Sequence, residues 1–355
     1  MARALEEAHQ TMRADNHPED LADLQFEPVS LPTPGPGELT TERLDGPLRR
    51  WADSEPMRVL ATASGWDWPT EQGTGDLITR LADYSADWDF RKQGGHVERN
   101  LIGNEPAVVN GREIPEPLIT AAAQALGLVT ATPVPEEPVT ALVVLSGLVR
   151  ACVNRTRYAA ELMQNGVHTK SVTVLAGHRA LGGDEPAMAR ELGLGDPVDE
   201  AEAVVAATQD AFGLGAPLKI IESAPEPSGW DDTLWGESAH YGWGSVDVTV
   251  VPSSDPAHRR VNTVDQLRYW ARERGINSTD RVLLLTTQIY VPFQQFAGLQ
   301  VLGIERGCQV YCCGVDAANS VLPGRTFRGR NYLQEIRSAL LAAMSLVAAV
   351  RESGR

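Results

Sequence analysis

Short, uninterrupted apolar runs recur along the second half of the chain, and a helical pattern follows most of them. The first run lies in Ala141–Leu145 and ends in the small residues Ser146 and Gly147. A run without polar alternation is typical of a strand buried on both faces, as in a parallel sheet. Similar runs predict strands over 171–176, 219–222, 246–251, 281–286 and 309–315. The alternation predicts an α/β fold with a mostly parallel, doubly wound sheet and helices on both faces.

Apolar residues spaced three and four apart predict the helices between these strands. The helix after the first strand carries Tyr158, Leu162 and Met163 on one face, and Gly166 is a suitable stop. Further helices are expected near 186, over 199–212, 263–274, 293–302 and 332–350. By contrast, 223–245 is expected to be a long irregular loop rich in aromatic residues. Such a loop forms a lid or a binding wall, or packs on the domain's own surface.

Proline-rich breaks divide the chain into three predicted parts. Residues 1–47 are expected to form an N-terminal helix and an arm, with a linker-like break at 31–37. Residues 48–132 are expected to form a small helical domain or cap, with helices over 76–84 and 116–126. After a linker at 133–138, residues 138–355 form the predicted ligand-binding domain.

Charge and cysteine content limit the partners that the chain can have. The 355 residues carry a formal net charge of −16, which disfavours nucleic acid as a partner of the whole surface. The N-terminus is polar, without a signal peptide's apolar centre, and we find no apolar run of membrane-span length. We therefore expect a cytoplasmic protein without a membrane partner. The four cysteines lack the paired spacing of metal ligands and are expected to be buried structural thiols.

Polar residues follow the predicted strands, in turns that a doubly wound sheet gathers at one edge. The candidates in these turns are Ser146, Gly147, Arg150, Gly177, His178, Arg179, Glu185, Asn262, Thr263, Thr287, Gln288 and Gln294. Such a set suits a small polar ligand, with Arg150 for an anionic group and Glu185 for an amine or a ribose hydroxyl. We find no dinucleotide-binding, P-loop or nucleophile-elbow motif. Asp184 and Glu185 are explained by the helix dipole, so no metal is expected.

The order of these turns resembles the YdcF/SanA/ElyC family over about residues 139–316. The matching features are 144–147 with Arg150, 174–177 with Gly182, Gly183 and Glu185, the pair Asn262 and Thr263, and 284–287 with Tyr290, Pro292 and Gln294. The resemblance implies a Rossmann-like fold with a pocket at these turns, associated with S-adenosylmethionine or with envelope roles. The family's His-Met-Pro-Arg is Tyr290-Val291-Pro292-Phe293 here, and a helical N-terminal domain replaces its membrane anchor.

These features predict a transferase-like enzyme that binds S-adenosylmethionine or another adenosine-containing ligand. His178 and Glu185 are the candidate catalytic residues, because the reference pKa of histidine, about 6.5, suits proton transfer near neutrality. One alternative is aminoacyl transfer from tRNA to a small acceptor, with Arg325–Arg330 as a basic patch, although the net charge disfavours it. Another is a non-catalytic nucleotide-binding module, favoured by the loss of a titratable group at Tyr290. The sequence leaves open whether the protein is a homodimer.

Overall fold

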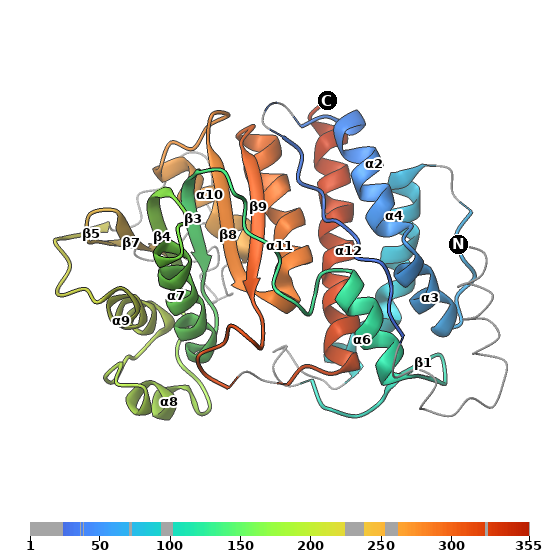
Figure 1. The fold of residues 1–355 in the computed structure, drawn as a ribbon, viewed down its shortest axis with the longest axis horizontal. Coiled ribbons are helices and arrows are strands. Elements are labelled where there is room, and N and C mark those ends of the chain that lie inside the picture. The colour runs from blue at the N-terminus through green and yellow to red at the C-terminus, as the bar shows by residue number, and fades with distance from the viewer. Residues whose placement is uncertain are drawn as a thin grey trace.

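A seven-stranded sheet forms the centre of the protein in the computed structural model (Figure 1). The structure describes residues 24–35, 37, 39–70, 73–93, 102–223, 238–252, 262–323 and 326–354. The strand order is β5-β6-β7-β4-β3-β8-β9. The strands are β3 (Val139–Leu145), β4 (Thr169–Gly177), β5 (Lys219–Ser223), β6 (Ser238–Gly242), β7 (Val246–Val251), β8 (Arg281–Thr287) and β9 (Gln309–Val315).

The five strands from β7 to β9 are parallel, and β3 lies in the middle of them. From β3 the chain first adds β4 and β7 on one side and then returns to add β8 and β9 on the other. The strand order therefore reverses between β3 and β8, where open α/β sheets bind ligands at their carboxyl ends. This architecture confirms the predicted α/β fold with a mostly parallel sheet and is compatible with a Rossmann-like fold.

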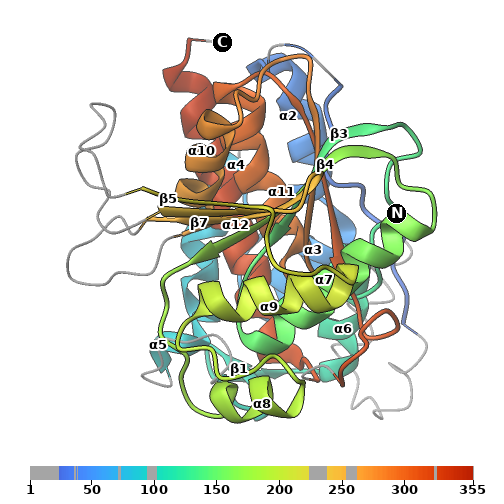
Figure 2. The ribbon, with the colours of Figure 1, turned by 90° about the vertical axis from the view of Figure 1, so that its left-hand side faces the viewer.

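Helices cover both faces of the sheet, as Figure 2 shows with the sheet near edge-on. One face carries α7 (Val149–Gln164) and α9 (Glu200–Phe212), with α8 (Glu185–Glu191) packed on α7. The other carries α10 (Thr263–Glu273) and α11 (Val291–Gly298), which a π-helical segment, Leu299–Glu305, continues. Adjacent residues of β3, Val143 and Val144, point into the cores on opposite faces and are both buried. An uninterrupted apolar run is the consequence of this double burial.

The N-terminal helices pack against the long last helix, α12 (Gly329–Glu352), and share a core with the sheet. Their bounds are Thr41–Ala52 (α2), Glu55–Ala63 (α3), Thr74–Tyr84 (α4), Phe90–Gln93 (α5) and Glu116–Ala125 (α6), with strands Ala107–Val109 (β1) and Arg112–Ile114 (β2). Trp51 of α2 is fully buried against Phe296 of α11, with ring centroids 5.1 Å apart. The side-chain amide of Gln295 donates to the carbonyl of Pro32 at 2.7 Å. The arm and the N-terminal helices are thereby joined to the sheet's own helices.

Helix α12 corrects one expectation about apolar length. Within the described part of the chain it is the one helix that is long and apolar enough to cross a membrane, although 61% of its most apolar window is buried inside the protein. The helix is apolar on several sides because it lies between α11 and the N-terminal helices α4 and α6. Packing inside the protein therefore accounts for its composition.

Two strand assignments also differ from the sequence-based expectation. The predicted irregular loop at 223–245 contains strand β6, which pairs antiparallel with both β5 and β7. Trp243 is buried rather than part of a lid, and its indole N–H donates to the carbonyl of Gly215 at 2.9 Å. Trp230 and Trp235 lie outside the described residues. The hairpin of β1 and β2 was not expected at all.

Replacing Trp51 by alanine tests whether the N-terminal helices and the sheet share one core. We expect Trp51→Ala to lower the free energy of unfolding by about 3–5 kcal/mol, because a fully buried indole is lost. Urea unfolding followed by tryptophan fluorescence and by circular dichroism should give one coincident transition. Val108→Ala, at an exposed position of β1, is the control and should change stability little. Two separate transitions, with only one shifted by Trp51→Ala, would contradict a shared core.

Candidate functional site

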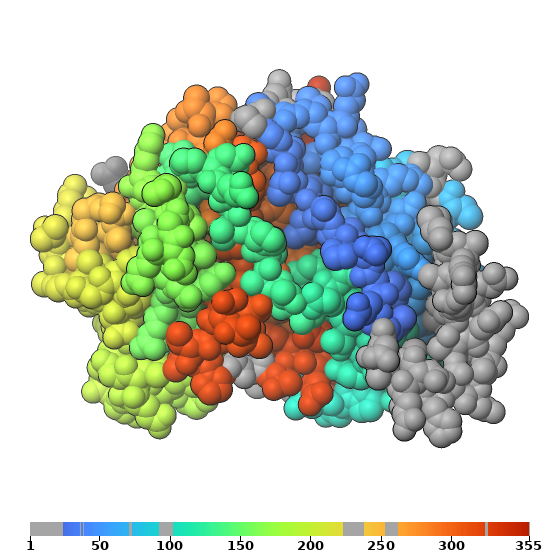
Figure 3. Space-filling model, in the orientation of Figure 1, coloured from blue at the N-terminus to red at the C-terminus, as the bar shows by residue number. Residues whose placement is uncertain are grey.

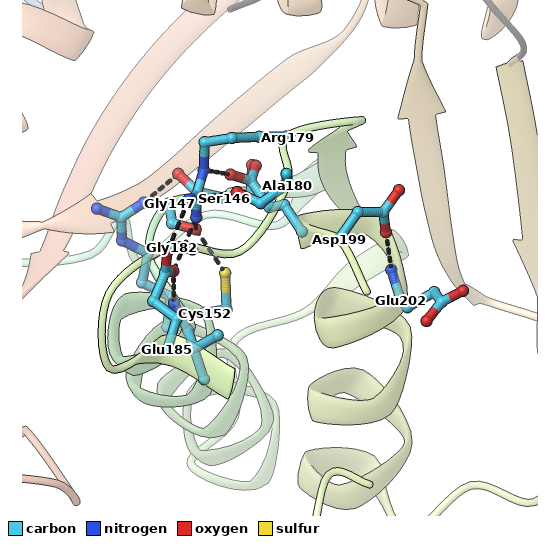
Figure 4. Close-up of polar contacts among 12 residues, drawn as sticks. Ser146, Gly147, Cys152, Arg179, Ala180, Gly182, Glu185, Asp199 and Glu202 are labelled. Carbon is cyan, nitrogen blue, oxygen red and sulfur yellow. Dashed lines mark hydrogen bonds and ion pairs between the residues drawn. The ribbon is translucent and has the colours of Figure 1, made fainter. Parts of the chain in front are cut away.

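The turns after β3 and β4 meet at the carboxyl edge of the sheet around one arginine, Arg179 (Figure 4). Its guanidinium donates to both carboxylate oxygens of Glu185, at 2.7 and 2.8 Å, and to Glu200 at 2.8 Å. It also reaches the carbonyl of Gly147 at 3.4 Å. The turn after β4, the start of α8 and the start of α9 are thus held together by a single side chain.

Glu185 accepts hydrogen bonds from several directions at once. Besides Arg179, the backbone N–H groups of Val149 and Gly182 donate to it, at 3.0 and 3.1 Å. Burial opposes ionisation of this carboxyl, but the bonds from Arg179 and the two N–H groups outweigh burial and hold its pKa below the usual value. Glu185 is therefore a stable anion that positions two turns, and a low pKa makes it a poor proton acceptor.

The first residues of α9 hold two further polar groups. Asp199 is the N-cap of the helix, accepting from the N–H of Glu202 at 2.9 Å. Its other carboxylate oxygen lies 3.0 Å from Nδ1 of His178. Glu200, the next residue, accepts from the hydroxyl of Ser146 at 2.5 Å. A carboxylate on Nδ1 fixes the orientation and tautomer of a histidine, so the His178 and Asp199 pair is the arrangement in this cluster suited to moving a proton.

A second arginine, Arg155 of α7, lies at the point where the strand order reverses. Its guanidinium donates to the carbonyls of Leu145 and Ser146, at 2.6 and 2.7 Å, and to the hydroxyl of Thr287, at 3.0 and 3.1 Å. The residue is only 4% exposed. Burial lowers the pKa of the guanidinium, but an arginine stays protonated near neutrality. Arg155 is therefore a buried cation bonded to neutral oxygens at the end of β3 and β8.

The electrostatics around Arg155 differ from those around Arg179. Among the described residues, no carboxylate makes an ion pair with Arg155, and Glu200 acts on it only through space. The ring of Tyr290 has its centroid 6.0 Å from the guanidinium carbon, which is within cation–π range. Arg179 already has two carboxylates, whereas the charge of Arg155 is left without a direct counterion.

Several predicted ligand contacts lie on the other side of the same edge, on α10 and α11. Asn262 is the N-cap of α10 and accepts from the N–H of Asp265 at 3.0 Å. The side-chain amide of Gln294 donates to the hydroxyl of Thr263 at 3.2 Å, while its carbonyl oxygen is buried without a hydrogen-bond partner. Gly177 ends β4. On this side of the edge, the carbonyl oxygen of Gln294 is thus a buried hydrogen-bond acceptor that no described donor uses.

Two predicted site residues instead bind other segments of the chain. Gln288 donates to the carbonyl of Gly127 at 2.7 Å and accepts from the N–H of Thr132 at 3.1 Å, so it anchors the linker from the N-terminal part. Arg150 donates to the carbonyl of Pro323 at 2.7 Å. In the predicted basic patch, Arg325 lies outside the described residues, and Arg330 pairs with Glu105 at 3.0 Å. No contact within the described residues joins any of these side chains to Arg179.

The cysteines are buried free thiols, as expected from their spacing. Cys152 lies close to the site, where its thiol donates to the carbonyl of Gly147 at 3.3 Å. Burial raises the pKa of this thiol to about 12, so it stays protonated and is not a nucleophile. In the described ranges, no group of three or more metal-ligating side chains comes together.

Three of the residues that build the site were not singled out from the sequence: Arg155, Asp199 and Glu200. Arg155 had a usable signal, because it lies three residues after Cys152 and four before Ala159, on the face of α7 that the helix buries. A charged residue on a buried face is unusual and points to function or to a partner. Asp199 and Glu200 are typical of a helix start, which hid their contacts with the neighbouring turns.

Comparisons with known proteins extend over nearly the whole chain. A protein-family model described as the Rv3785 N-terminal domain matches residues 35–127. The chain is 26% identical over 349 residues to the uncharacterized proteins Rv3785 of Mycobacterium tuberculosis (strain ATCC 25618 / H37Rv) and Mb3814 of Mycobacterium bovis. These alignments cover 92% of this chain and 95% of each relative. No solved structure matches the chain. Because these relatives are named without an activity, function has to be argued from the site.

Replacing Glu185 by glutamine tests whether its ion pair holds the turns together. We expect Glu185→Gln to cost about 1–3 kcal/mol near pH 7, because an amide turns an N–H group toward the donors that the carboxylate binds. A carboxyl whose pKa is lowered by folding stabilises the protein above its unfolded pKa, near 4.5, and loses that effect as pH falls through the folded value. The difference in free energy of unfolding between wild type and variant should therefore be largest near pH 7 and decrease below about pH 4.

Urea denaturation across this pH range measures the effect. Glu161→Gln, which removes an exposed carboxylate of α7, is the matched control and should leave both stability and its pH dependence nearly unchanged. A loss of stability that is the same at pH 7 and at low pH would show that packing, rather than the charge of Glu185, holds the turns.

Proposed function

We propose that this protein is a transferase-like enzyme that binds an adenosine-plus-amino-acid ligand, whose amino-acid part carries a free carboxylate, at the carboxyl edge of the sheet, S-adenosylmethionine being the candidate. The ligand's carboxylate would lie against Arg155, between the ends of β3 and β8. The rest of the ligand would extend along the turns after β3, β4 and β8. The resemblance of these turns to the YdcF/SanA/ElyC family supports the choice of ligand and remains a prediction.

The observation that carries the proposal is that Arg155 is buried and, in the part of the chain that the structure describes, has no carboxylate bonded to it. A buried cation without a directly bonded anion costs several kcal/mol, and proteins usually compensate it with a carboxylate or a bound ligand. Arg155 lies at the reversal of strand order, where ligands bind in this architecture. A ligand carboxylate would add a charge-assisted hydrogen bond in a region of low dielectric, where such a bond is strong.

The remaining groups divide the work of binding and chemistry. The unused carbonyl oxygen of Gln294 is available to accept from an amino or hydroxyl group of the ligand. If the ligand is S-adenosylmethionine, its methyl group passes from the sulfonium to an acceptor nucleophile, and the acceptor loses a proton. His178, oriented by Asp199, would accept that proton. Glu185 and Arg179 would position the turns and would not react.

A non-catalytic ligand-binding module is the second candidate function. The observation in its favour is that Arg179 is bonded to both Glu185 and Glu200, so Glu185, one of the two predicted catalytic residues, is engaged in an ion cluster that keeps its pKa low. In such a module, closing around the ligand would be the whole function. The two candidates share the site at Arg155 and differ in the role of His178.

Thermal unfolding with a panel of ligands tests the proposed site. The panel consists of S-adenosylmethionine, S-adenosylhomocysteine, adenosine, NAD and a non-hydrolysable aminoacyl-adenosine. A ligand at about a hundred times its dissociation constant stabilises the folded state by about 2.7 kcal/mol. S-adenosylmethionine and S-adenosylhomocysteine carry a free carboxylate, which adenosine and the aminoacyl-adenosine lack. We expect the first two ligands to raise the unfolding midpoint well above the midpoint measured with the other two.

Arginine variants on α7 give the matched comparison. Arg155→Met should abolish the additional shift, and Arg155→Lys should keep part of it, because an ammonium retains the charge but loses the planar fork. Arg157 is on the same helix as Arg155, and Arg157→Met, which removes its ion pair with Asp210 of α9, should leave the shift unchanged. Equal shifts with adenosine and S-adenosylhomocysteine, a full shift in Arg155→Met, or no shift with any ligand would each overturn the proposal.

The role of His178 separates the two candidate functions. In an enzyme, His178→Asn should keep the midpoint shift while turnover of bound S-adenosylmethionine with its acceptor falls by about two orders of magnitude or more. This turnover is measured by chromatography as the conversion of S-adenosylmethionine to S-adenosylhomocysteine. Unchanged turnover would exclude His178 as the base, and binding without turnover in the wild type would favour the module.

A further inference from the structure

The amino ends of β3, β4 and β8 border a pocket at the opposite edge of the sheet from Arg155 and Arg179. Its volume is about 490 Å³, which is within the range of small-molecule sites. The strand arrows in Figure 1 point away from this edge. In Figure 3, the green and orange segments that contain the bordering turns meet at the top of the molecule. The pocket is thus separate from the candidate functional site.

Lys170, Thr140 and Arg281 lie in one row across this end of the sheet, and all three line the pocket. The β3–β4 register places Lys170 beside Thr140, and the β3–β8 register places Arg281 on its other side. The backbone N–H of Arg281 donates to the hydroxyl of Thr140 at 3.1 Å. Residues that pair across neighbouring strands point to the same face, so the ammonium and the guanidinium emerge on one side of the sheet. Two strand spacings, or about 10 Å, separate their Cα atoms.

The basic side chains of the pocket have no acidic partner. Within the described residues, no carboxylate bonds to His168, Lys170 or Arg281, and none lines the pocket. Asp280 and Glu137 are next to lining residues in the chain, but Asp280 accepts from a backbone N–H of its own turn at 2.9 Å. Acidic residues outnumber basic ones by 47 to 31 in this protein, so the pocket is a cationic exception. Two cations without counterions repel one another, and an anion bound between them relieves that repulsion.

A hydroxyl group adds to the donors of the pocket. Ser278 lines it, and the hydroxyl of Ser278 makes no hydrogen bond within the described residues. The neighbouring hydroxyl of Thr279 is already bonded to the side chain of Asn277 at 2.8 Å, which holds this turn in place. A phosphate group carries about two negative charges and several strong acceptor oxygens near pH 7, whereas a carboxylate carries one charge. Two cations with a free hydroxyl therefore match a phosphate group better than a carboxylate.

We propose that this pocket binds a small phosphate-bearing anion, with Lys170 and Arg281 on either side of the phosphate and Ser278 and His168 as further donors. Pro138 lines the same pocket and offers an apolar contact to an organic part of the ligand. The net charge of −16 disfavours a long polyanion such as nucleic acid, so the ligand is a small molecule. The site does not depend on the proposed function, because the pocket shares no residue with the carboxyl edge.

Isothermal titration calorimetry of the full chain with pyrophosphate, at constant ionic strength, tests the site. We expect one pyrophosphate to bind per chain. Lys170→Gln and Arg281→Gln should each weaken binding about tenfold or more, because each removes one of the two cations that bond to the phosphate. Lys219→Gln is the matched control, since it removes an exposed lysine at the amino end of β5, three strands away from β4. It should leave the affinity nearly unchanged.

A further variant, Arg155→Met, distinguishes this pocket from the candidate functional site. Pyrophosphate binding should persist in Arg155→Met, and circular dichroism shows whether each variant is folded. Binding that Arg155→Met abolishes and Lys170→Gln leaves unchanged would overturn the proposal. So would the absence of pyrophosphate binding to the wild type, or a loss of affinity in Lys219→Gln as large as that in Lys170→Gln.

Discussion

The guanidinium of Arg155 joins the ends of β3 and β8, the two strands between which the sheet reverses its order. It is held by two carbonyls and a hydroxyl, so its position is fixed, although no carboxylate of the described residues is bonded to it. A buried charge of this kind constrains what can bind at this end of the sheet. A cation or an uncharged apolar group would leave the guanidinium without a counterion, whereas a carboxylate or phosphate would supply one. The proposed class of ligand thus rests on one side chain.

A second constraint comes from the start of α9. Asp199 and Glu200 are adjacent in the chain, yet one orients His178 and the other binds Ser146 and Arg179. The four formal charges of Arg155, Arg179, Glu185 and Glu200 sum to zero, but both carboxylates are bonded to Arg179. The described residues therefore combine a rigid ion cluster with a buried cation to which no carboxylate is bonded. Rigid support beside a buried cation that has no bonded counterion is suited to a preorganised binding site.

Local patterns predicted most of the sheet, because buried parallel strands need continuous apolar runs. The ranges 246–251 and 309–315 agree with β7 and β9, and the helices at 199–212 and 263–274 lie within a residue of α9 and α10. Strand β6 was missed because its sequence, Ser238–Gly242, has no apolar run: it pairs antiparallel with both neighbours near the edge of the sheet, where continuous burial is not required. The hairpin of β1 and β2 had a signal: Asn110 and Gly111 both adopt positive φ, as a tight two-residue turn requires.

The site was predictable only in part, since contacts between turns depend on tertiary structure. The turns themselves were located correctly, but Arg150 and Gln288 bind other segments of the chain, and Arg155 was hidden inside a helix. The most direct test of the account is nuclear magnetic resonance of the arginine Nε–H groups in protein labelled with ¹⁵N-arginine, with Arg155→Lys identifying the signal. The account predicts that saturating S-adenosylhomocysteine shifts the Arg155 signal and leaves that of Arg157 in place. An Arg155 signal that stays unchanged at saturation would contradict it.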